Sequence, residues 1–128
     1  MPSIKLARSI VGLLILQFLL GVLASMYQEV PEGHPEEVFH QFGFISVHIL
    51  TGTLLLVLGA IFLYQAVKRK AYKAEAIRGF GAMIAAYAFG EAFVFTQNDI
   101  WSFLMAGAFI GALLPYVTIM NTARLKDK

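Results

Sequence analysis

Residues 46–70 read SVHILTGTLLLVLGAIFLYQAVKRK. No Lys, Arg, Asp or Glu occurs in this stretch before Lys68. The hydrocarbon core of a bilayer is about 30 Å thick, and roughly 20 apolar residues are needed for a helix to cross it. The stretch therefore predicts a membrane-spanning helix that ends in a basic loop.

Three more apolar stretches accompany this one. We expect helices at about residues 7–27, 39–67, 76–96 and 100–120. The chain has 128 residues, of which 59% are hydrophobic and only 14% charged, which is too apolar for an ordinary soluble domain. The sequence therefore predicts an all-α protein: a single domain over residues 1–128, folded as an integral membrane four-helix transmembrane bundle.

The charges give this bundle a direction. All ten Lys and Arg residues lie in three clusters, at residues 5–8, 68–78 and 124–128. Five of the eight acidic residues lie in the two remaining loops, at Glu29, Glu32, Glu36, Glu37 and Asp99. The positive-inside rule then predicts a multi-pass protein of the cell membrane with both termini cytoplasmic. The basic loop suits anionic lipid head groups better than nucleic acid.

A cleaved signal peptide is the rival interpretation of the first apolar stretch, because Lys5 and Arg8 precede it. The run from Ile10 to Ala24 is as long as the longest typical signal core, and no clear A-x-A cleavage site follows. We expect the segment to be retained as a helix, since an even number of spans places every basic cluster on one side.

Few polar residues interrupt the predicted spans, and an ionisable one there indicates a functional site. The exceptions are Gln17, His48, Thr51 and Glu91. At about 1.5 Å of rise per residue, His48 and Glu91 each lie about 10 Å below the outer surface. We therefore expect a hydrogen bond between His48 and Glu91, either of which can also contact a cofactor. Gln17 is expected deeper, near the middle of its helix.

Several chemistries suit these residues. Neutral imidazole is a common axial ligand of haem iron, and bundle cores hold membrane haems. A His–Glu pair can instead relay protons or line a quinone or ion site, or simply fix helix register. His34, Glu36, Glu37 and His40 together offer ligands for a divalent metal. The chain has no cysteine, which excludes disulfides, thiolate metal sites and thiol catalysis.

About residues 7–67 resemble half of a haem A synthase, through LLILQFLLGVLAS and EEVFHQFGFISVHILTGTLLLVLGAIFLYQ. Gln17 and Gly21 match the family's Gln and Leu-Gly step, and Glu37 and His40 match its Glu-x-x-His element. The resemblance implies haem near the outer leaflet. It gives the ligand role to His48, alone or together with His40. Glu91 lies outside the resemblance, and we expect it to tune the site or to hydrogen-bond to it. The helix at 100–120 lacks the family's second His. Met105 is either a substitute ligand there or a side chain that fills a gap in the packing.

Three functions follow as hypotheses. The first is a haem-linked membrane protein, with or without synthase activity, whose cofactor residues are His48, His40 and Glu91. The second is a small non-enzymatic subunit of a respiratory or other membrane complex, with Gly and Ala faces for partner subunits or a second copy and with His48 and Glu91 as interhelical contacts. The third is a small transporter in which Glu91 is the protonatable gate.

Overall fold

The computed structural model of the chain describes residues 3–27, 34, 37, 40 and 43–126. These residues form four α-helices: α1 (Ile4–Tyr27), α2 (Phe44–Lys68), α3 (Lys73–Thr96) and α4 (Asp99–Lys126). Each helix is long and apolar enough to cross a bilayer. The predicted all-α architecture with four spans is confirmed, and its apolar helices are those of a multi-pass protein in a lipid bilayer.

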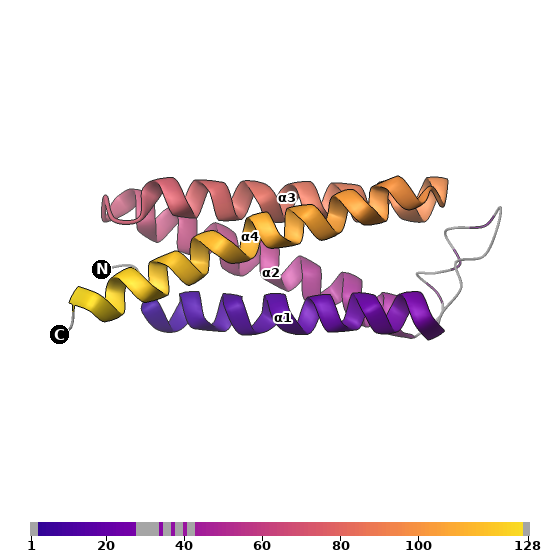
Figure 1. Ribbon diagram of the computed structural model, residues 1–128, viewed down its shortest axis with the longest axis horizontal. Coiled ribbons are helices and arrows are strands. Elements are labelled where there is room, and N and C mark those ends of the chain that lie inside the picture. Colours follow the sequence, from indigo (N-terminus) through magenta and orange to yellow (C-terminus); the bar gives the residue numbers. More distant parts are fainter. Residues whose placement is uncertain (1–2, 28–33, 35–36, 38–39, 41–42, 127–128) are drawn as a thin grey trace.

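Each helix runs antiparallel to the next one in the chain (Figure 1). The helices pack as a ring, in which α1 and α3 each contact both α2 and α4. The start of α1, the turn between α2 and α3, and the end of α4 lie together at one end of the bundle, seen on the left of Figure 1. We call this the basic end, because Lys5, Arg8 and residues 68–78 lie there. The opposite end is called the far end.

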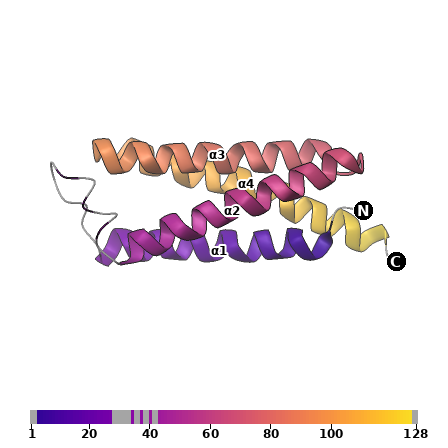
Figure 2. The same ribbon diagram turned by 180° about the vertical axis from the view of Figure 1, so that it is seen from behind.

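The two ends of the bundle are arranged differently. In Figures 1 and 2, α2 and α4 cross between α1 and α3. At the far end α2 lies beside α1, and α4 lies beside α3. The ring pair Tyr27–Phe44 joins the first two helices there, with centroids 6.2 Å apart, and Phe89–Trp101 joins the other two at 5.9 Å. The far half of the bundle is thus built from two helical hairpins.

The helix boundaries differ from those predicted. α2 begins at Phe44 instead of near residue 39, and His40 lies in a turn where its amide N–H donates to the Glu37 carbonyl (3.0 Å). α1 and α3 begin three residues before the predicted starts at 7 and 76, and α4 runs six residues past 120. The apolar runs mark the hydrocarbon core, whereas charged residues continue the helix into the polar interface. Most of the acidic loop, including Glu29, Glu32 and Glu36, lies outside the described residues.

The turn between α3 and α4 is only two residues long. Gln97 adopts the left-handed conformation (φ 52°), and its N–H donates to the Phe93 carbonyl at 2.7 Å. The side-chain oxygen of Asn98 accepts a hydrogen bond from the N–H of Ile100 (3.0 Å), so Asn98 caps α4. This tight connection keeps the far ends of α3 and α4 side by side.

The hydrophobic core fills the half of the bundle nearer the basic end. Its largest fully buried side chains are Ile10, Phe62, Tyr116 and Ile119, from α1, α2 and α4. Phe62 and Tyr116 meet edge to face, with ring centroids 5.5 Å apart. Gly79 lets α3 approach this cluster, because a Cβ atom at residue 79 would lie 2.6 Å from Cε2 of Tyr116. Close packing therefore joins the four helices at this end.

The substitution Gly79→Ala tests this packing. The added methyl group meets a ring that is 0% exposed and has no room to move. We expect a loss of about 1–3 kcal/mol in the free energy of unfolding, measured by circular dichroism in detergent. Gly81→Ala on the same helix is the matched control, because its Cβ has no neighbour within 4 Å. Equal stability of the two variants would contradict the account.

Candidate functional site

A cavity of about 1160 Å³ occupies the far half of the bundle. Its lining includes the buried core residues Leu14, Leu55 and Ala112, and it extends to Gln97 and Asp99 at the α3–α4 turn. All four helices contribute to its walls, which are mostly apolar. Phe18 and Phe109 stack with centroids 5.0 Å apart, joining α1 to α4 along the cavity. The polar residues of its lining are Gln17, Ser25, His48, Tyr87, Glu91, Gln97, Asp99 and Ser102.

The imidazole of His48 bonds to Gln17 through both of its nitrogen atoms. Nδ1 lies 3.0 Å from the backbone carbonyl oxygen of Gln17, and Nε2 lies 3.2 Å from the side-chain nitrogen. A carbonyl oxygen only accepts, so Nδ1 carries the proton. In a neutral ring Nε2 then has the lone pair and accepts from the Gln17 amide. The contact therefore selects the neutral Nδ1–H tautomer.

Two glycines make room for this contact, one on each helix. A Cβ atom at Gly21 would lie 3.0 Å from Cε1 of His48, and one at Gly52 would lie 2.9 Å from Nε2 of Gln17. Each polar residue therefore packs against the glycine of the opposite helix. α1 and α2 are antiparallel, so the step from residue 17 to residue 21 on α1 runs in the same direction as the step from residue 52 to residue 48 on α2. Each step covers about one helical turn. The pairing fixes the register of the α1–α2 hairpin.

One polar atom of this contact has no partner. Oε1 of Gln17 is buried and accepts no hydrogen bond from the described residues. A buried acceptor without a partner costs about 1–3 kcal/mol, so the Gln17 amide contributes little net stability to the fold in this position. This atom belongs to a side chain of the cavity lining, as does the His48 ring.

The predicted hydrogen bond between His48 and Glu91 is not formed. Both ring nitrogens of His48 bond to Gln17 on α1, and Glu91 is exposed, with no hydrogen bond or ion pair to the part of the chain that the structure describes. Both residues do line the same cavity. Equal depth was inferred from helix rise, but rise does not tell which way a side chain points around its helix.

The remaining candidate residues separate into two groups. Met105 lines the cavity, and its sulfur lies 3.3 Å from where a Gly90 Cβ would be. His40, by contrast, is exposed in the turn before α2 and does not contribute to the lining. His34 and Glu37 are also among the described residues, and both are exposed, whereas Glu36 lies outside the described residues. No three His, Asp or Glu side chains form a metal-binding group among the described residues.

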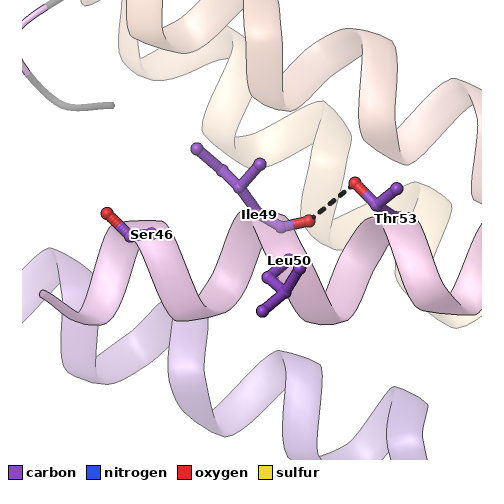
Figure 3. A pocket seen from close by; sticks show the side chains of 4 residues that line it. All are labelled: Ser46, Ile49, Leu50 and Thr53. Atoms are coloured by element: carbon purple, nitrogen blue, oxygen red, sulfur yellow. Dashed lines mark hydrogen bonds between the residues drawn. The ribbon is translucent and has the colours of Figure 1, made fainter. Parts of the chain in front are cut away.

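A second, smaller pocket lies along α2 (Figure 3). It is lined by Ser46, Ile49, Leu50 and Thr53, all from this one helix. The hydroxyl of Thr53 donates to the Ile49 carbonyl at 3.0 Å, so it is already bonded within the helix. The pocket gathers no converging polar groups from a second helix, and the larger cavity remains the candidate site.

The partnership of Gln17 with His48 was not predicted from the sequence. The signal was nevertheless present, because each polar residue has a glycine four positions further along its helix. In an antiparallel pair this spacing allows each polar side chain to lie over the other helix's glycine.

No family model, curated protein or solved structure matches this chain.

A double-mutant cycle tests the corrected pairing. We expect Gln17→Leu and His48→Leu to be coupled by about 0.5–1.5 kcal/mol in unfolding free energy, because each removes the same interhelical hydrogen bond. The cycle of His48→Leu with Glu91→Gln is the control and should show coupling near zero, since these side chains do not bond. Stronger coupling of His48 to Glu91 than to Gln17 would overturn the assignment.

Proposed function

We propose that the protein binds haem in the far-half cavity, where Nε2 of His48 would hold the iron. The observation that supports this proposal is the state of the imidazole. The Nδ1–H group of His48 is committed to a backbone carbonyl, which leaves a single ring nitrogen with a lone pair at a large apolar cavity. Metal-ligating histidines commonly donate their other ring N–H to such a carbonyl, which fixes tautomer and orientation.

The cavity suits a group of this class. Binding pockets for small molecules and cofactors are concave, mostly apolar and about 300–1,000 Å³ in volume, and this cavity of about 1160 Å³ is slightly larger than that range. Met105 on α4 lines the same space and is the candidate for a second ligand, because thioether sulfur is an established axial ligand. Bound haem would supply a redox-active iron whose potential depends on these ligands.

The chain's own residues have separate parts in this proposal. His48 supplies the ligand nitrogen, and the backbone of Gln17 orients the ring. Glu91 lines the cavity and supplies a carboxyl group for hydrogen bonding to the edge of the ligand. His40 is not in the lining, so the ligand role that the resemblance to haem A synthases leaves to His40 or His48 goes to His48 here.

The proposal includes an orientation. Lys5, Arg8 and residues 68–78 lie at the basic end, so the positive-inside rule places both termini in the cytoplasm and the cavity near the outer leaflet of the cell membrane. The chain has no cysteine, so His34→Cys and Lys73→Cys each add a unique thiol. In intact cells a membrane-impermeant maleimide should label only the first, and labelling of only the second would reverse the orientation.

A second candidate function is that of a small non-enzymatic subunit of a membrane complex. The observation in its favour is that His48 and Gln17, with their opposing glycines, already form a helix-to-helix contact without a cofactor. In that case the polar pair fixes register and nothing more. Co-purification of other subunits after gentle solubilisation supports this function, and a monodisperse protein without partners contradicts it.

The visible spectrum tests haem binding. When the protein is produced with haem supplied and purified in mild detergent, we expect a Soret band that shifts on reduction. His48→Ala should abolish the band because it removes the ligand nitrogen.

His40→Ala is the matched control for the spectrum, and it should leave the band intact because His40 lies outside the cavity lining. A colourless wild-type protein despite haem supply, or a band retained in His48→Ala, would refute the proposal.

A further inference from the structure

We infer that Gln17 is a displaceable cap on the ligand nitrogen of His48, so that Gln17 limits how tightly and how fast haem binds. This inference rests on the proposed function. It assigns the Gln17 side chain a regulatory role that opposes haem binding, rather than a purely structural role.

The cap follows from the single lone pair of the ring. Because Nδ1–H donates to the Gln17 carbonyl, the only lone pair in the ring plane is at Nε2. The side-chain nitrogen of Gln17 lies 3.2 Å from Nε2 and donates into that lone pair. A metal ion bound at Nε2 needs the same lone pair, at the shorter distance of about 2.0–2.1 Å. Nε2 can therefore coordinate iron only after the Gln17 amide has moved away.

The cap is held weakly enough to be displaced. The amide nitrogen gains one hydrogen bond, but the amide oxygen is buried without a partner in the described structure. A typical hydrogen bond contributes only about 0.5–1.5 kcal/mol net, and the unpaired oxygen offsets part of it. Gln17 lines the cavity, which extends to the α3–α4 turn, so rotation of the side chain has space to occur. The Gln17 amide on Nε2 of His48 therefore slows haem binding but does not prevent it.

The orientation of the ring is independent of the cap. Nδ1 bonds to the backbone carbonyl of residue 17, which any amino acid at that position supplies. Replacing the side chain of Gln17 by leucine therefore removes the cap and leaves the hydrogen bond that holds the imidazole. This separation makes the inference testable without disturbing the ligand residue.

Gly52 supplies the space in which the cap lies. A Cβ atom at residue 52 would be 2.9 Å from the Gln17 side-chain nitrogen and 3.7 Å from Cδ. Both atoms belong to the far end of a flexible side chain, so Gly52→Ala displaces the amide at little cost to the fold. The two variants uncover Nε2 in different ways, one by removing the amide and one by moving it.

The experiment is a titration of haem-free protein with ferric haem in detergent, followed at the Soret band. We expect Gln17→Leu and Gly52→Ala to bind haem about two- to tenfold more tightly than wild type, as loss of one capping hydrogen bond implies. The association rate constant should rise in the same direction. Gly107→Ala is the matched glycine control, because a Cβ there has no neighbour within 4 Å, and it should bind like wild type.

The outcomes separate the inference from the proposed function. If wild type does not bind haem, or His48→Ala binds equally well, the proposed function fails. If binding requires His48 but the folded variants bind no more tightly than wild type, the cap alone is overturned. Should Gln17→Leu fail to fold, as judged by its helical circular dichroism, Gly52→Ala decides the question, because that variant retains the Gln17 side chain.

Discussion

The two hydrogen bonds between His48 and Gln17 set the register of the α1–α2 hairpin, and the cavity lining of the far half depends on that register. Within a bilayer, helices gain little from burying apolar side chains against each other, so close backbone approach and polar pairs position them. Close backbone approach and a polar pair occur together here, because each polar side chain lies over the glycine of the opposite helix. A shift of register by one residue would separate both pairs at once. The hairpin of α1 and α2 is thereby held beside a cavity that does not itself provide packing.

The two halves of the bundle have different roles. Towards the basic end, Phe62, Tyr116 and Ile119 are fully buried, and Gly79 admits the Tyr116 ring to the surface of α3. This half joins all four helices and contributes the packing that stabilises the fold. Towards the far end the chain forms two hairpins (Figure 1), and residues of both hairpins line the cavity. A site is best supported by rigid elements, and the packed half supplies that support to the side chains that line the open half.

Apolar run length and charge distribution were sufficient to predict the number of helices and their antiparallel order. The helix ends were harder to predict, because α3 begins at Lys73 and α4 continues past Arg124, beyond the apolar runs, while α2 begins only at Phe44. Helix rise predicts similar depths for His48 and Glu91, and both residues line one cavity. The predicted hydrogen bond between these two residues is wrong, because helix rise carries no information about rotation around the helix axis. The spacing of Gln17 to Gly21 and of His48 to Gly52 carries that information, and it points to α1 as the partner.

The ligand nitrogen, the cap and the pairing that sets the helix register all depend on the protonation state of His48. The most direct measurement is the ¹⁵N NMR spectrum of histidine-labelled, haem-free protein at neutral pH. The chain has three histidines, so replacing His34 and His40 leaves His48 as the only reporter. The account predicts a neutral ring with the proton on Nδ1 and an unprotonated, hydrogen-bonded Nε2. A ring that carries its proton mainly on Nε2 would contradict it.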